Sequence, residues 1–206
     1  MKNRKLMWVI VSAVSIFFVG CVAETPRYTG FLSDYSKLES QSNTSFRYLD
    51  MTELGKYSKF IIEPVEMRLY KSSEASSSLS QEDRTDIKSY MHAALVKALE
   101  GGPYEIVYRP GPGVARVRVA ITDLKKSEII QNTMPLTKLA GTGLGGASLE
   151  AELVDSQTHK QIGAVVESQV GDRLSLDGYA TWGDAKAIMD GWAERFRARL
   201  DESRSK

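Results

Sequence analysis

The chain has 206 residues, of which 42% are hydrophobic and 26% charged, and this composition excludes a globally disordered protein and favours one folded domain. Its 27 basic and 26 acidic residues give a net charge of +1, which excludes a strongly basic nucleic-acid-binding protein. The single cysteine excludes an internal disulfide framework.

The first predicted element is an export signal at residues 1–20. Lys2, Arg4 and Lys5 precede an apolar stretch over residues 6–19, which is shorter than the roughly 20 residues of a bilayer-spanning helix. A basic start, a short apolar stretch and small residues after it are typical of a signal peptide. Its removal leaves 24 basic and 26 acidic residues, so the mature chain carries a net charge of −2.

The only cysteine directly follows this stretch, in the order Phe18-Val19-Gly20-Cys21. This order resembles the lipobox of bacterial lipoproteins, although Phe18 stands where leucine is usual. The resemblance implies cleavage after Gly20 and acylation of Cys21, with palmitate among the acyl chains, and more than one chain gives stable membrane attachment. Val22, rather than aspartate, implies a Gram-negative outer membrane with the protein facing the periplasm. The alternatives are an ordinary signal peptide that ends at a stray cysteine and an uncleaved anchor.

The mature chain is expected to begin with a lipidated tether and docking segment over residues 21–50. Its apolar side chains suit a turn or short helix that packs on the domain; they are Phe31, Leu32, Tyr35 and Leu38. A polar loop is expected over 41–45. A single domain follows over 51–202, with a solvated tail at 203–206.

Alternating apolar and polar residues predict the strands of this domain. They lie over 59–70, 104–108, 114–124, 148–155 and 161–170, and Pro64 marks an edge or bulge in the first. Capping patterns at Ser80 and Thr181 predict the starts of two amphipathic helices. The expected fold class is α+β: an antiparallel sheet of about four to five strands, with two amphipathic helices packed on one face and the other face open.

Four of these segments together resemble the bacterial lipoprotein family called domain of unknown function 3313, DUF3313. They read GFLSDYSKL, VARVRVAITDL, GTGLGGASLEAELVDSQT and WGDAKAIMDGWAERFRARL. The resemblance implies a lipoprotein with a compact α+β domain and no assigned catalytic residues. His159 stands where the family usually has glycine, at a turn expected to need a positive φ, which histidine tolerates better than most residues.

Three glutamates are the best candidates for acid–base chemistry. Glu150, Glu152 and Glu167 are expected on the open sheet face near Arg116 and Arg118, and paired carboxylates can act as acid and base. Cross-strand pairing of glutamate with arginine on a solvated face explains the same residues without function, and we favour that interpretation.

Other motifs do not support a cofactor or metal site. The glycine pattern at 141–146 precedes a predicted strand rather than the helix that phosphate binding needs, and Ala147 stands at the lysine position of a P-loop. His92 and His159 are the only histidines, and neither is flanked by carboxylates at ligand spacing. We therefore expect no cofactor, no metal and no catalytic residue.

The connection over 125–147 is the strongest candidate for a partner-contact loop. Its apolar residues include Ile129, Ile130, Met134, Leu136 and Leu139. Long loops without secondary structure are often functional, and an exposed apolar patch marks a contact with protein or lipid. Coverage of one end of the core explains the same residues equally well.

Two functions therefore stay open. The first is a non-enzymatic accessory lipoprotein that is anchored through its acyl chains and contacts an envelope protein. The second is a binding module for a lipid, glycan or small molecule, which a ligand-sized apolar cavity beneath 125–147 would favour. A hydrolase lacks the necessary motifs, no nucleic-acid partner is expected, and the oligomeric state stays undetermined.

Overall fold

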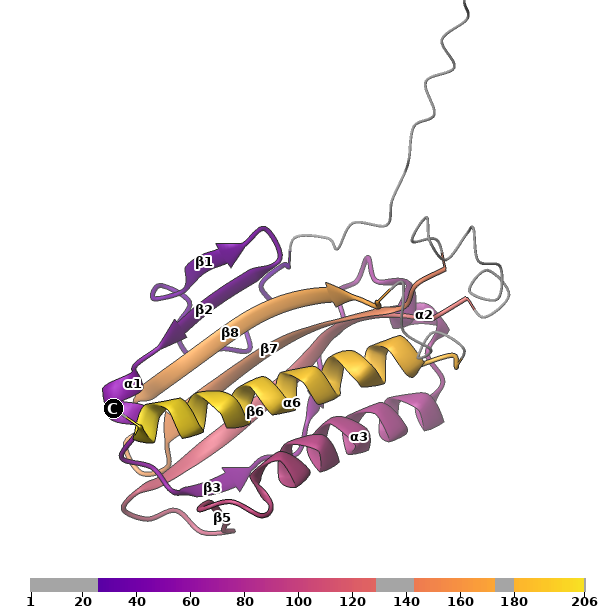
Figure 1. Ribbon diagram of the computed structural model, residues 1–206. Coiled ribbons are helices and arrows are strands. Elements are labelled where there is room, and N and C mark those ends of the chain that lie inside the picture. The colour runs from indigo at the N-terminus through magenta and orange to yellow at the C-terminus, as the bar shows by residue number, and fades with distance from the viewer. Residues whose placement is uncertain (1–25, 129–142, 173–179, 206) are drawn as a thin grey trace, which may run out of the picture.

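The computed structural model describes residues 26–128, 143–172 and 180–205. The strands are β1 (Glu39–Ser42), β2 (Ser45–Leu49), β3 (Lys59–Ile62), β4 (Glu66–Met67), β5 (Glu105–Ile106), β6 (Val114–Lys125), β7 (Gly146–Asp155) and β8 (Gln161–Val170). The helices are α1 (Met51–Leu54), α2 (Glu74–Ser78), α3 (Gln81–Leu99) and α6 (Gly183–Arg204). The strands form one sheet in the order β1-β2-β8-β7-β6-β3-β5, with β4 also paired to β6 (Figure 1).

The predicted fold class is wrong in strand number, strand direction and helix number. Over the described residues the sheet has eight strands and is mixed, because β3 runs parallel to both β5 and β6 while β6, β7 and β8 are antiparallel. Helix α3 follows β3 and returns the chain across the sheet, so the next strands run in the direction of β3. The described residues also contain four helices rather than two.

The missed elements are short or polar. β1 is exposed at all four positions. β1 and β2 lie at one edge of the sheet and include most of residues 41–45, which we expected to form a loop. Pro64 separates β3 from the two-residue β4, so the single strand predicted over 59–70 is divided. α1 and α2 span only four and five residues, too few to show a helical repeat.

The two long helices begin in different ways. Ser80 caps α3 as predicted, because its hydroxyl accepts a hydrogen bond from the amide of Asp83 at 3.0 Å. The predicted cap at Thr181 is wrong, since α6 begins at Gly183 after Trp182, whose side chain makes no capping hydrogen bond. Acidic Asp184 in the first turn still complements the helix dipole.

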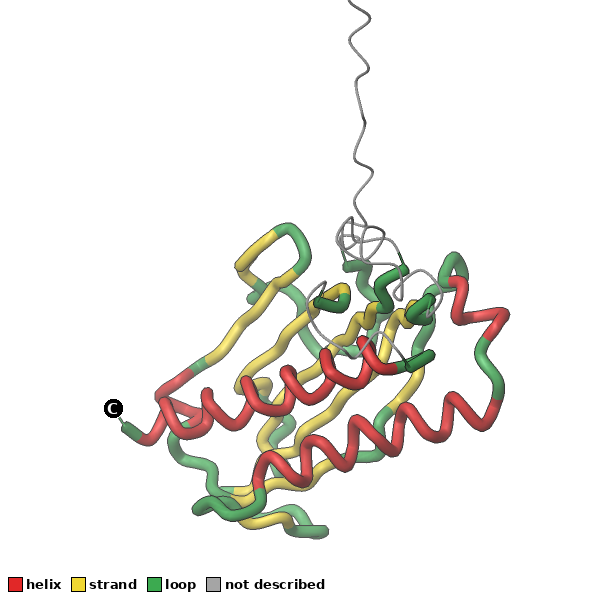
Figure 2. Tube along the Cα trace, turned by 45° about the vertical axis from the view of Figure 1, so that its right-hand side comes forward, coloured by secondary structure: helices red, strands yellow, loops and turns green. Residues whose placement is uncertain are grey.

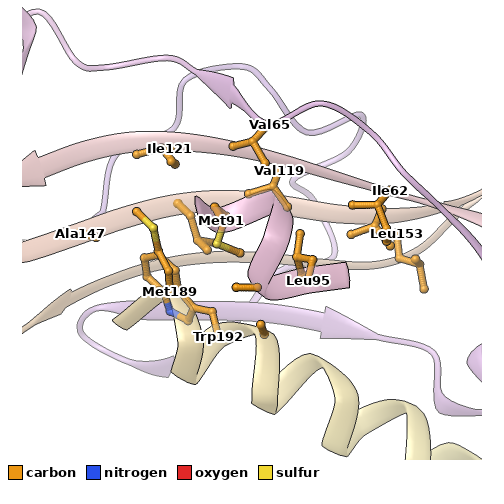
Figure 3. Close-up of a cluster of buried hydrophobic side chains, with 14 of the residues drawn as sticks. Ile62, Val65, Met91, Leu95, Val119, Ile121, Ala147, Leu153, Met189 and Trp192 are labelled. Atoms are coloured by element: carbon orange, nitrogen blue, oxygen red, sulfur yellow. The ribbon is translucent and has the colours of Figure 1, made fainter. Parts of the chain in front are cut away.

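The main core lies between these helices and one face of the sheet. Figure 1 and Figure 2 show α3 and α6 side by side over the long central strands. Alternate residues of β6, among them Val119 and Ile121, point to this face and meet Met91 of α3 and Met189 of α6 in the cluster of Figure 3. All four are buried, and each such side chain contributes about 1.5–3 kcal/mol of transfer free energy.

The opposite sheet face is not open, contrary to our expectation. Residues 27–38, the docking segment, lie across it and form a second apolar cluster. Phe31 and Leu32 are buried there against Ala120, Ala164 and Val166. The small alanines leave room for the ring of Phe31, over which the guanidinium groups of two arginines also lie. The domain thus has three layers: helices, sheet and docking segment.

The hairpin between β7 and β8 turns at His159, whose φ of 58° confirms the expected positive value. Asp155 organises this turn: one carboxylate oxygen accepts hydrogen bonds from the amides of Gln157 and Thr158, and the other accepts one from the hydroxyl of Tyr57. The hydrogen bond from the Thr158 amide is the largest of the contributions that lower the pKa of Asp155 from 3.8 to about 2.

Asp155 should therefore make stability depend on pH. Its pKa is lower in the folded chain, so its contribution is complete above about pH 4 and is lost as the pH falls towards 2. We expect Asp155→Asn, which keeps the shape but removes the charge, to lower the free energy of unfolding at pH 7 by about 1–2 kcal/mol, a value reduced for partial exposure. Urea unfolding at pH 7 and pH 2.5 tests this, and a difference that stays constant between the two pH values contradicts it.

Candidate functional site

Two buried glutamates of β7 hold the docking segment. Glu150 is fully buried, and its carboxylate accepts hydrogen bonds from the amide of Thr29 at 2.5 Å, the amide of Phe31 at 3.3 Å and the hydroxyl of Tyr35 at 2.5 Å. Burial, and then this hydrogen bond, raise the pKa of Tyr35 to about 12, so the phenol remains a donor at neutral pH. The buried charge is compensated by three donors of one segment.

Glu152 provides the second attachment. Its carboxylate accepts hydrogen bonds from the amide and hydroxyl of Ser33 at 2.8 and 2.7 Å and from the side-chain amide of Gln161 at 3.0 Å. Arg118, its partner across the β6–β7 ladder, completes the site with an ion pair. The cross-strand pairing that we favoured is therefore confirmed for Arg118 and Glu152.

The three glutamates do not form one acid–base site. Glu150 and Glu152 lie beneath the docking segment, with their oxygens engaged by its donors. Glu167 lies on the helix face of the sheet, where it pairs with Arg195 of α6 at 2.9 Å. Arg116 pairs with Glu63 rather than with any of them. This arrangement positions a segment and leaves no carboxylate pair facing a substrate.

A cavity opens on the helix face because two helices cannot cover so wide a sheet. A helix with its side chains is about 10 Å wide and strands are about 4.8 Å apart, so two helices cover roughly four strands. α3 contacts β3, β4 and β5, whereas α6 contacts β7 and β8. β2, the next strand outward, extends beyond this cover. A cavity of about 150 Å³ lies beneath α6 and extends outward to β8 and β2, and residues of α3 and β6 line its inner end.

Small residues form the floor of this cavity. Ala151 of β7 and Val165 of β8 are cross-strand partners. Two residues before Val165 in β8, Gly163 lies opposite Leu49 of β2. A Cβ atom on Gly163 would come within 2.7 Å of a Leu49 methyl group, so a larger residue there would have to displace the Leu49 side chain. Trp192 of α6 lines the cavity from the helix side. Apolar groups thus surround a space that the core does not fill.

Charged side chains border the apolar interior. Arg47 of β2 and Arg195 and Arg199 of α6 line the cavity, together with Glu167. Glu167 pairs with Arg195, and Glu202 pairs with Arg199 at 2.6 Å. Arg47 donates to the neutral side-chain oxygen of Gln41 at 3.1 Å and has no carboxylate partner among residues 26–128, 143–172 and 180–205.

The residues that we predicted as sites lie outside the described part of the chain. These are Gly20 and Cys21 at the N-terminus and Ile129, Ile130, Met134, Leu136 and Leu139 in the connection after β6. The cavity that the structure describes lies beneath α6 and extends to β8 and β2. The cavity that we expected beneath 125–147 would involve residues outside the described ranges. The sequence signal for it is weak: alanine and glycine on the helix-facing parity of β7 and β8, where larger residues fill a core.

Two further features were sought within the described ranges. No three histidine, cysteine, aspartate or glutamate side chains there are grouped as metal ligands. Over the same residues, no helix has both the length and the apolar character to cross a bilayer. The cavity and the docking segment are therefore the two features from which function can be argued.

The family model of DUF3313, described as a protein of unknown function, matches residues 27–196. The chain belongs to this family. The DUF3313 match begins at the first residue of the docking segment and ends within α6, so it covers all three layers of the fold. The family resemblance found in the sequence is thereby confirmed.

Comparison with curated proteins found no match. Among solved structures, a PelC dodecamer from Paraburkholderia phytofirmans is 10% identical, with a TM-score of 0.45 over 76% of this chain and 96% of that chain. The hypothetical protein CT253 from Chlamydia trachomatis is 13% identical, with a TM-score of 0.40 over 70% and 98%. A minor lipoprotein from Acinetobacter baumannii is 8% identical, with a TM-score of 0.31 over 72% and 93%. Likenesses of this degree carry no functional argument here.

Proposed function

We propose that this member of the DUF3313 family is a lipid-anchored, non-enzymatic envelope lipoprotein whose domain binds a small apolar ligand. The cavity between α6 and the outer strands carries the proposal, because it is lined by apolar side chains and bordered by charged groups. Its size favours one chain or ring, since a cavity of about 150 Å³ accepts a molecule such as benzene. A glycan would leave its hydroxyl groups unpaired there.

The anchor in this proposal is Cys21, at a Gram-negative outer membrane facing the periplasm. Arg27 lies six positions after it, a span of at most roughly 20 Å. Arg27 is held by Tyr70, which accepts from its amide at 3.1 Å, and by Ser72, whose hydroxyl accepts from its side chain at 2.7 Å. The acyl chains would thus keep the domain close to the membrane, with this end nearest to it.

Ligand binding can be tested on the mature chain with serine in place of Cys21, which avoids the detergent that acyl chains would require. We expect native mass spectrometry of this protein, purified from the periplasm, to detect a bound small molecule. Ala151→Leu adds three carbon atoms inside the cavity and should abolish the bound mass without loss of the fold. Ala198→Leu makes the same addition at an exposed position of α6 and is the control. A ligand retained by Ala151→Leu contradicts the assignment of this cavity.

Anchoring is tested separately. We expect radioactive palmitate to label the wild-type chain in cells and the outer-membrane fraction to contain it, whereas Cys21→Ser removes the label. A wild-type chain without the label contradicts the anchor.

Contact with an envelope protein is the second candidate function. It is favoured by the five apolar residues between Ile129 and Leu139. Photo-crosslinking residues at Ile130, Met134 and Leu139 in living cells are expected to give a discrete protein adduct, with Arg118, half-buried beside the docking segment, as the control position. Adducts to lipid alone, or no adduct from a folded protein, count against this function.

A further inference from the structure

The proposed function does not name the chemical class of the ligand. The charged side chains that line the cavity limit which classes can bind there. Arg195 and Arg199 are four residues apart, on one side of α6, and each has a carboxylate partner. Arg47 faces the same side of the sheet as Val165, its cross-strand partner in β8. It is the cavity-lining arginine whose only hydrogen bond within the described residues is to a neutral acceptor.

A guanidinium group that makes no ion pair within the described residues, beside an apolar cavity, favours an anionic ligand. Arginine presents a planar fork of donors that matches a carboxylate with two parallel hydrogen bonds. Because the other two arginines already hold glutamates, the mouth has room for a single additional negative charge. A monoanionic carboxylate fits this balance better than a phosphate, which brings up to two charges.

The volume of the cavity limits the length of the ligand's alkyl chain. A volume of about 150 Å³ corresponds to about six carbon atoms by comparison with benzene. Arg47 also lines the cavity, so an alkyl chain that is longer by a few carbon atoms can place its headgroup beside this arginine. A chain of about eight carbon atoms would fill the cavity and also place its headgroup beside Arg47.

We infer that the cavity binds a single-chain fatty acid of medium length, with its alkyl chain on Ala151 and Val165 and its carboxylate at Arg47. This inference rests on the proposed function, since it names the class of ligand for the same cavity. The inference requires that binding depend on both the alkyl chain and the negative charge of the ligand.

The fluorescence of Trp192 can be used to measure ligand binding. In the mature chain with Cys21→Ser and Trp182→Phe this residue is the only tryptophan, so its fluorescence reports on the cavity directly. We would titrate this protein with octanoate, with octanol, with octyl phosphate and with inorganic phosphate. Octanoate should bind about tenfold more tightly than octanol, as expected when one charge-assisted interaction contributes about 1.4 kcal/mol. Octyl phosphate should bind more weakly than octanoate, and inorganic phosphate should cause no change.

Two variants identify the groups responsible. Arg47→Gln should weaken octanoate binding to the level of octanol and leave octanol unchanged. Ala151→Leu should abolish binding of both, while circular dichroism and the melting temperature show that it is folded. Equal binding of octanoate and octanol, or tighter binding of octyl phosphate, overturns the fatty-acid inference but leaves the proposed function standing. Absence of binding by every probe overturns the inference, and the ligand detected by native mass spectrometry then decides the proposed function independently.

Discussion

Replacing Glu150 with alanine is expected to lower the free energy of unfolding by about 3–5 kcal/mol, the range for breaking a buried charged network. The substitution leaves the amides of Thr29 and Phe31 and the hydroxyl of Tyr35 without their acceptor. Each unpaired buried donor costs about 1–3 kcal/mol unless the segment moves into water. We therefore expect the docking segment to detach before the rest of the domain unfolds.

Limited proteolysis and urea unfolding measure the two parts of this effect. Lys37 is already exposed, but proteases need a backbone that can leave the folded surface. Detachment should therefore make cleavage by trypsin after Lys37 and by chymotrypsin after Tyr35 much faster than in the wild type. Glu66→Ala is the matched control: Glu66 forms an exposed ion pair with Arg68, and its loss should cost less than about 1 kcal/mol. Equal stability of the two variants would show that the buried carboxylate does not hold the segment.

Replacing Asp184 with alanine is expected to lower the free energy of unfolding by about 2–4 kcal/mol. This buried carboxylate in the first turn of α6 accepts hydrogen bonds from the hydroxyl of Ser127 at 2.9 Å and the amide of Gly145 at 2.7 Å. It thereby joins the segments that follow β6 and precede β7 to the start of the helix. Its loss also removes a favourable charge from the helix N-terminus, worth about 0.3–1 kcal/mol.

A glycine beside Asp184 provides an independent test of the same packing. A Cβ atom on Gly171 would lie 2.3 Å from Cγ of Asp184, so Gly171→Ala should destabilise the chain although it adds only a methyl group. Asp190→Ala is the control on the same helix, because Asp190 is exposed and only accepts a hydrogen bond from Tyr90. Thermal unfolding of the three variants should rank Asp190→Ala as the mildest. A melting temperature of Asp184→Ala that matches the wild type would contradict this role.

The ion pair between Glu152 and Arg118 could be predicted from the sequence, but the burial of Glu152 could not. Residues of one parity on neighbouring strands share a face, so the ion pair was predictable from alternation alone. Alternation does not show what covers that face. Glu150 and Glu152 therefore looked like solvated side chains, although in the structure they are the buried acceptors for residues 29–35.

The sequence by itself determined the elements whose pattern is strong and local. These are α3 with its Ser80 cap, the alternating strands β6, β7 and β8, the left-handed turn at His159 and the membership of the DUF3313 family. The helix, the strands and the turn depend on periodicity, on capping or on short-range backbone preference, which neighbouring residues decide. The family membership depends on the resemblance of four segments to DUF3313.

Only the tertiary structure decided the rest. The parallel pairing of β3 depends on which strand lies beside it after the α3 crossover, and the polar β1 and β2 become strands because β8 offers an edge. The docking segment depends on contacts between residues up to 128 positions apart, and the cavity depends on the width of two helices relative to that of the sheet. Such contacts are set by packing and closure of the whole chain, which no local pattern of residues records.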